Sequence, residues 1–146
     1  MNSRDVMDLE TPARLVCAQH IGECRSRGIE LLVTSTWRDI EAQNGLYAIG
    51  RTVNPERRIV TNAKGGKSWH NYRCAWDVVP LIGGKCVWDP FNPVWKEVVA
   101  IGKNLGAEAG ADWPKFPDLP HFQVTPKALT LEVAFERFTE QGTIFV

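Results

Sequence analysis

Histidine and cysteine are both scarce in this chain of 146 residues, which contains three and four of them. No two cysteines are spaced as CxxC, and this absence argues against a structural zinc knot. Cys17 and Cys24 lie on one predicted helix, too far apart along its axis for a relaxed disulfide bridge. We therefore expect all four cysteines to be reduced and mostly buried.

Long apolar runs and a net charge are missing as well. Seventeen basic side chains balance seventeen acidic ones, so the sequence lacks the basic footprint of a nucleic-acid-binding protein. No apolar run is long enough for a transmembrane helix, and the polar start MNSRDVMDLETP has no apolar core of a secretory signal. These absences predict a protein that binds no nucleic acid, does not insert into a membrane, and either works in the cytoplasm or is exported without a signal peptide.

The order of the predicted elements indicates an α+β protein. Helices are expected over residues 12–27, 38–49, 92–105 and 125–141, and strands over 29–35, 58–61, 74–81, 85–88 and 121–124. Two long loops, 50–67 and 107–120, lie between them, and such loops in compact domains are usually functional or mobile. No repeat or linker is evident. Residues 1–146 are therefore predicted to form one domain with a small, mostly antiparallel sheet and flanking helices.

Two ionisable residues stand in apolar strand sequences. Asp77 lies in CAWDVVP and His121 in LPHFQV, and a buried carboxylate is costly unless it is paired or bound to a metal. With His70, they form a set of three ligands, which is typical of a catalytic zinc site with one open position. Read alone, His70 and Asp77 are more typical of a structural pair, such as a surface histidine and a capping aspartate. The remaining histidine, His20, is expected at the surface or boundary of its helix without a function.

A zinc hydrolase also needs a base and a cation near the metal. Asp118 precedes His121 by three residues, and Pro120 stiffens the link between them, so its carboxylate could be held near the metal without binding it. It could instead only cap the turn before Pro120. Arg38 follows a predicted buried strand and could grip a carboxylate or an oxyanion, or simply pair with a neighbouring acid. Ser68 could donate a hydrogen bond to the same oxygen.

The segment SWHNYRCAWD, residues 68–77, is similar to the SxHxxGxAxD motif of a family of zinc peptidases. That family includes D-Ala-D-Ala carboxypeptidases and dipeptidases and phage L-alanyl-D-glutamate endopeptidases. TSTWRDIEAQNGLYAIGRT resembles its arginine-bearing strand and helix, VTNAKGGKSWHNY its approach to the first ligand, and DWPKFPDLPHFQ the final motif of the endopeptidase branch. The carboxypeptidases have Glu-x-x-His in place of the DLPH ending. The resemblance covers about residues 10–125 in the family's order.

This resemblance implies a fold like that of hedgehog proteins and D-Ala-D-Ala peptidases, and one Zn²⁺ ion per chain. It assigns the zinc ligands to His70, Asp77 and His121 and the role of base to Asp118. It places Arg38 and Ser68 at the substrate or the oxyanion. The residues expected to line the site are Gln43, Trp69 and Trp113.

One position departs from the motif, because its glycine is Arg73 here. We expect the backbone there to suit a side chain, and the side chain to point outward from the strand.

The resemblance predicts a zinc-dependent peptidoglycan endopeptidase that hydrolyses the L-Ala–D-Glu bond of the stem peptide. It further implies a monomeric, single-domain phage or prophage endolysin that stays in the host cytoplasm until a holin releases it to the cell wall. Two alternatives remain open at this point. One is a D-Ala-D-Ala carboxypeptidase of the same fold, and the other is a non-catalytic zinc-binding or wall-binding module, which would not need Asp118.

Overall fold

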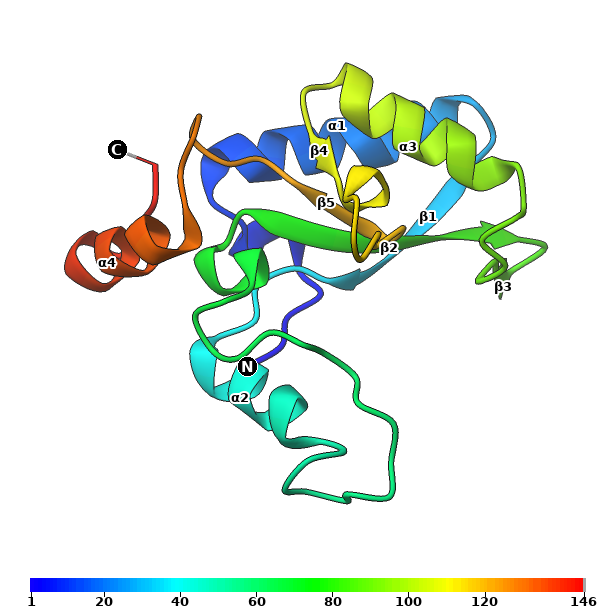
Figure 1. Ribbon diagram of the computed structural model, residues 1–146. Helices are drawn as coiled ribbons and strands as arrows, with labels where there is room; N and C mark the ends of the chain where they lie inside the picture. The colour runs from blue at the N-terminus through cyan, green and yellow to red at the C-terminus, as the bar shows by residue number, and fades with distance from the viewer. Residues whose placement is uncertain (146) are drawn as a thin grey trace.

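A five-stranded antiparallel sheet forms the centre of the protein, whose computed structural model describes residues 1–145 (Figure 1). The strand order is β1-β2-β5-β4, and β3 pairs with the end of β2. The strands are β1 (Glu30–Ser35), β2 (Ala75–Ile82), β3 (Lys85–Cys86), β4 (Glu108–Ala109) and β5 (His121–Gln123). All four strand pairings are antiparallel. The predicted α+β class with a small antiparallel sheet is confirmed.

Helices α1 and α3 lie side by side on one face of this sheet, while α2 lies on the other side (Figure 1). A proline in the first turn and a positive φ of 79° at Gly28 mark the two ends of α1. The α-helices are α1 (Thr11–Ser26), α2 (Ile40–Ala48), α3 (Val94–Asn104) and α4 (Leu131–Gln141). The described part of the chain also forms short 3₁₀ helices, which are η1 (Val6–Asp8), η2 (Trp69–Tyr72) and η3 (Gly110–Asp112). None of the helices in residues 1–145 combines the length and the apolar character needed to cross a membrane.

Strand alternation separates an apolar face of the sheet from a polar one. Trp76 of β2 and Phe122 of β5 are opposite each other in the strand register, are fully buried and stack. Phe122 also lies under α3, where an added Cβ on Gly102 would come within 2.8 Å of its ring. Because successive side chains of a strand point to opposite faces, Asp77 and His121 must point away from α1 and α3. The same two strands thus build the core and the polar site.

His20 is fully buried, so the expectation of a surface or boundary residue was wrong. Its Nε2 lies 2.9 Å from the Val98 carbonyl oxygen, and its Nδ1 accepts a hydrogen bond of 3.2 Å from the Trp76 indole. The ring also packs edge-on against Phe122. Burial lowers the pKa of His20, and only the carbonyl of Val98 opposes this shift. A neutral His20 therefore links α1, α3 and β2 within the core.

Several elements differ from the sequence prediction. Residues 58–61 form no strand, and β3 ends at Cys86 rather than at Trp88. The last helix begins at Leu131, where Thr130 caps it by accepting a hydrogen bond from Val133. A helix starting after Thr125 is interrupted at Ala128, whose φ of 59° is left-handed. The predicted loop 107–120 contains β4 and η3, because pairing with β5 imposes extended structure on a short segment.

The cysteines agree with the prediction that they are reduced and mostly buried. All four carry free thiols, and Cys17, Cys24 and Cys74 are buried while Cys86 is exposed. Burial raises the pKa of the Cys17 thiol to about 12, so this thiol is inert as a nucleophile at neutral pH. The buried cysteines act as small apolar side chains of the core.

Candidate metal and catalytic site

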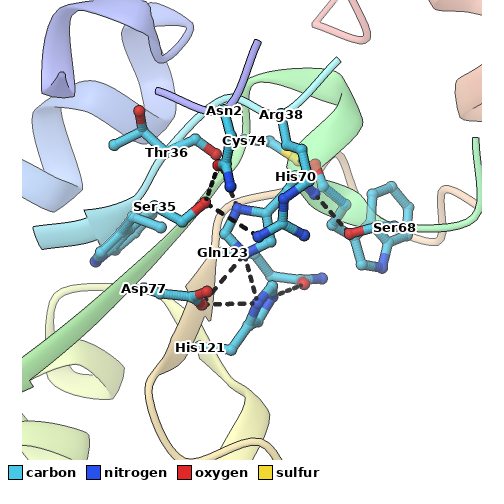
Figure 2. Close-up of polar contacts among 12 residues, drawn as sticks. Asn2, Ser35, Thr36, Arg38, Ser68, His70, Cys74, Asp77, His121 and Gln123 are labelled. Carbon is cyan, nitrogen blue, oxygen red and sulfur yellow. Dashed lines mark hydrogen bonds and ion pairs between the residues drawn. The ribbon is translucent and has the colours of Figure 1, made fainter. Parts of the chain in front are cut away.

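Three metal-ligand side chains converge on the polar face of the sheet (Figure 2). His70 comes from η2, and Asp77 and His121 are paired residues of β2 and β5. His70 Nε2 lies 3.1 Å from Asp77 Oδ1 and 3.2 Å from His121 Nδ1, and His121 Nδ1 lies 3.4 Å from Asp77 Oδ1. Both histidines are buried, and the Asp77 side chain is 21% exposed. The three donor atoms therefore surround one small volume that could hold a metal ion.

Hydrogen bonds on the far side of each imidazole fix which nitrogen carries the proton. His70 Nδ1 lies 2.8 Å from the Thr36 carbonyl oxygen, and His121 Nε2 lies 2.7 Å from Gln123 Oε1. Since a carbonyl oxygen can only accept, each of these nitrogens donates, and the opposite nitrogen keeps its lone pair. Two lone pairs and a carboxylate then face one another with no proton between them. This arrangement fits a bound cation, because ligating histidines usually donate their second N–H in this way.

The charges in the donor set reinforce one another. Burial opposes ionisation of Asp77. When no cation is bound and the imidazoles take up a second proton, attraction to His70 and hydrogen bonds from the two rings outweigh burial and hold the pKa of this carboxyl well below its usual range. Burial likewise lowers the pKa of His121, yet the adjacent Asp77 raises it by more. Asp77 is therefore a carboxylate at all ordinary pH values and supplies the negative charge that a cation at this site requires.

Gln123 holds His121 in place, and sequence reasoning missed it. The residue is 2% exposed, and its Nε2 donates a hydrogen bond of 3.1 Å to Glu108 Oε2 on β4. That bond orients the amide so that its oxygen faces His121 Nε2. Gln123 is two residues after His121 on a strand, so period-two alternation already puts both on one face. This alternation was the signal that could have identified it.

Gly110 supports the turn that carries Asp118 and His121, and no local pattern in the sequence singled it out. The Gly110 carbonyl accepts a hydrogen bond of 2.9 Å from the Asp118 amide. A Cβ added at Gly110 would collide with the Asp118 carbonyl oxygen and lie 2.9 Å from the Cβ of His121. Only glycine therefore allows the backbone of η3 to approach this turn so closely.

Arg38 is held by a network of hydrogen bonds that starts at the N-terminal segment. Its Nη2 donates a hydrogen bond of 3.2 Å to Ser35 Oγ, and Ser35 Oγ in turn donates one to Asn2 Oδ1 (Figure 2). Its Nη1 donates a hydrogen bond of 3.0 Å to Gln43 Oε1, and Gln43 Nε2 donates one to the Ala63 carbonyl oxygen. Burial lowers the pKa of Arg38, although Asp77 and Asp118 oppose this. Gln43 is fully buried behind Arg38 and is not among the residues that line the cavity.

A cavity of about 740 Å³ opens beside the metal-ligand set. Its wall includes the predicted residues Arg38, Ser68, Trp69, Trp113 and Asp118, together with all three predicted metal ligands. Ser68 caps η2, because its Oγ accepts a hydrogen bond of 3.3 Å from the His70 amide. The Trp113 ring lies 4.8 Å from the ring of His121 and so shields one side of that ligand. Phe116 and Lys67 also line the cavity, and neither was predicted.

Asp118 is close enough to the donor set to be affected by its charges. Burial and the negative charge of Asp77 raise the pKa of Asp118, against the attraction of His121, His70 and Arg38. Its backbone carbonyl accepts a hydrogen bond of 3.2 Å from the His121 amide, which fixes the three-residue spacing between them. A carboxyl with a raised pKa that lines the cavity suits proton transfer, because it can both accept and return a proton.

Arg73 departs from its expected conformation. Its backbone has φ 56° and ψ 34°, the left-handed region that the motif's glycine would favour, rather than one that suits a side chain. The side chain is half-buried, with its guanidinium 3.9 Å from the centre of the Trp37 ring. The expectation of an outward-pointing residue on a relaxed backbone was therefore wrong. The turn between the two ligands is kept, and Arg73 stacks on Trp37.

Comparisons with known proteins agree with this geometry. Residues 61–124, which include all three predicted metal ligands and Asp118, match the profile of a family described as D-alanyl-D-alanine carboxypeptidase. The chain is 38% identical over 109 residues to the peptidoglycan L-alanyl-D-glutamate endopeptidase CwlK of Bacillus subtilis (strain 168). That match covers 69% of this chain and 64% of the length of CwlK.

Solved structures share the fold at low sequence identity. The L-Ala D-Glu endopeptidase ChiX of Serratia marcescens superposes with a TM-score of 0.60 at 18% identity, over 86% of this chain and 89% of that one. The LD-carboxypeptidase LdcB superposes with a TM-score of 0.64 at 20% identity, over 88% of this chain and 68% of that one. The vancomycin-resistance D,D-pentapeptidase VanY, solved with Zn(II), superposes with a TM-score of 0.62 at 14% identity, over 92% of this chain and 80% of that one. With the predicted motifs in place on this fold, the chain belongs to the D-alanyl-D-alanine carboxypeptidase-like family of metallopeptidases.

Proposed function

We propose that this protein is a zinc-dependent peptidoglycan endopeptidase that hydrolyses the L-Ala–D-Glu bond of the stem peptide. The observation that carries the proposal is the donor set of His70, Asp77 and His121, whose protons are directed away from a shared centre beside a cavity. The choice of bond rests on the 38% identity to CwlK and on the DLPH ending. Three protein ligands with an open position are typical of catalytic rather than structural zinc.

In this proposal each side chain at the site has a distinct task. Zinc held by the three ligands would polarise the scissile carbonyl and make a water molecule more acidic. Asp118 takes a proton from the attacking water and delivers it to the leaving nitrogen, for which its raised pKa is suited. Arg38 binds the developing negative charge on the carbonyl oxygen or a nearby substrate carboxylate. This division of labour gives Asp118 and Arg38 separate roles beside the donor set.

The neighbouring residues position these groups or bind the substrate. Gln43 holds the Arg38 guanidinium, and Ser68 fixes the backbone of His70 through its cap of η2. Trp69 and Trp113 offer flat apolar walls to the stem peptide. This assigns Gln43 and Ser68 to positioning and the tryptophans to substrate binding.

The biological setting follows from the endopeptidase branch that DWPKFPDLPHFQ resembles. We propose a monomeric endolysin of phage or prophage origin, held in the host cytoplasm until a holin opens a path to the wall. Expression in a bacterial host with and without a holin tests this. Lysis that needs the holin supports the proposal, and lysis by the protein alone contradicts it.

Mass spectrometry of digested peptidoglycan tests the reaction itself. The native protein should release fragments with new amino termini on D-Glu and new carboxyl termini on L-Ala. Asp118→Asn should keep zinc and lose this activity by about a hundredfold or more. Release of terminal D-Ala alone would show a carboxypeptidase instead. Binding to the wall without new termini would show a non-catalytic module, and full lytic activity in Asp118→Asn would contradict the mechanism.

A further inference from the structure

Lys67 presents an ammonium group at the cavity from a rigid stretch of backbone. The amides of Gly66 and Ser68 on either side of it both donate to Asn71 Oδ1, at 2.9 and 3.3 Å. The amide of Gly65 donates a hydrogen bond of 2.8 Å to Asn44 Oδ1 of α2. Residues 65–68 are thus fixed to α2 and η2, although the Lys67 side chain itself is 54% exposed. Its Cα position is preorganised, while its ammonium remains free to exchange partners.

Arg38 and Lys67 are the two cationic residues among the described residues that line the cavity. The two Nη atoms of Arg38 already donate to Gln43 and Ser35. Lys67 Nζ instead lies 3.1 Å from Glu132 Oε1 on α4, whose side chain is 70% exposed. Exposed pairs of this kind contribute little to stability, since water competes for both charges. A substrate carboxylate entering the cavity can therefore replace Glu132 at low cost.

The substrate of the proposed function carries such a carboxylate. The D-glutamyl residue is linked onward through its side-chain carboxyl, so its α-carboxylate remains free beside the scissile bond. Two acidic side chains, Asp77 and Asp118, also line the cavity and would repel this group unless a cation offset them. Lys67 is the lining cation that pairs with a carboxylate on the exposed surface, that of Glu132.

We propose that Lys67 forms a carboxylate-binding subsite for the α-carboxylate of the D-glutamyl residue, and that Glu132 occupies it until substrate binds. This inference rests on the proposed endopeptidase function. It makes Lys67 a specificity-determining residue that distinguishes a free α-carboxylate from its amide. It also makes the Lys67–Glu132 pair a weak internal competitor of the substrate.

Synthetic peptides test the subsite directly. The probes are N-acetyl-L-Ala-γ-D-Glu-L-Lys-D-Ala, the same peptide with the D-Glu α-carboxylate amidated, and a third with only the C-terminal carboxylate amidated. The variants are Lys67→Gln, Glu132→Gln and, as a matched control, Lys64→Gln, an exposed lysine of the same loop that does not line the cavity. Zinc content and thermal unfolding of each variant show that the fold is kept.

For Lys67→Gln, kcat/KM should fall about fivefold to tenfold on the peptide with the free α-carboxylate and hardly at all on its amide. Glu132→Gln should raise kcat/KM on the acidic peptide by about twofold, because the competing carboxylate is gone. Lys64→Gln should match the native protein. The two variants should thus change kcat/KM in opposite directions. If the ion pair were purely structural, loss of either partner would have the same effect.

Equal losses on both peptides, or a loss in Glu132→Gln like that in Lys67→Gln, would overturn the subsite. A Lys67 effect that follows the C-terminal carboxylate instead would overturn the choice of ligand. If the native protein leaves the L-Ala–D-Glu bond of all three peptides intact, the proposed function fails. Cleavage with no change in preference in Lys67→Gln refutes the subsite alone.

Discussion

Replacing Gln123 by methionine should weaken zinc binding without touching a metal ligand. Methionine keeps nearly the same length and volume, but its thioether sulfur is too weak an acceptor to replace the hydrogen bond from His121 Nε2, which is 2.7 Å long in the native protein. The His121 N–H then stays buried without a partner, at a cost of about 1–3 kcal/mol. The imidazole can escape this cost by moving its proton to Nδ1, which is the nitrogen that faces His70 and Asp77.

Both outcomes reduce the affinity for the metal. Loss of a hydrogen bond that orients a ligating histidine typically costs about tenfold to a hundredfold in metal affinity. This corresponds to about 1.4–2.7 kcal/mol of binding free energy. Truncation of the outer residue Glu108 to alanine should cost less, since Gln123 keeps its oxygen and loses only the bond that orients its amide.

Competition with a chromophoric zinc chelator measures the dissociation constant of each variant, and thermal unfolding of the metal-free proteins checks the fold. Gln19→Met, an exposed glutamine of α1, is the matched control and should bind zinc like the native protein. A Gln123→Met protein that binds zinc within a factor of about two of the native affinity would refute the role given to this hydrogen bond.

Four further predictions concern the fold and the site. Burial lowers the pKa of His20 below 6.5, so the unfolded chain binds its proton more readily. The unfolding free energy should therefore fall as the pH drops from about 6.5 through the lower pKa of the folded state. Chemical denaturation at a series of pH values should show a shallower fall for His20→Gln than for the native protein. Gly110→Ala should lower kcat/KM about tenfold to a hundredfold by displacing Asp118 and His121, whereas Gly22→Ala, with open space around it, should not. Arg73→Gly should be more stable than Arg73→Ala by about 1 kcal/mol in denaturant titrations, because both lose the stacking contact but only alanine keeps the strained φ. A chelator should abolish peptidoglycan hydrolysis and added zinc should restore it, and lysis that persists in excess chelator would contradict a metal site.

Local sequence patterns determined the two strands that carry the site and the direction of their side chains. The alternation in CAWDVVP and PHFQV puts Asp77 and His121 on the face opposite Trp76 and Phe122, because the side-chain period of a strand is two. The closeness of Asp118 to His121 could also be predicted, because a stiff turn at Pro120 keeps two residues that are three positions apart near each other. These features depend only on residues that are neighbours in the chain.

Contacts between distant segments decided the rest. The proton positions on the ligands depend on Thr36, which is 34 residues from His70, and on an amide oriented by Glu108 on another strand. The buried place of His20 required α1 and α3 to meet over β2, and Lys67 meets Glu132 across 65 residues. No periodicity records such pairings, because they form only when packing of the apolar face has fixed how the elements lie against one another. The sequence therefore determined which residues could bind a metal, and the tertiary structure decided how each of them is held.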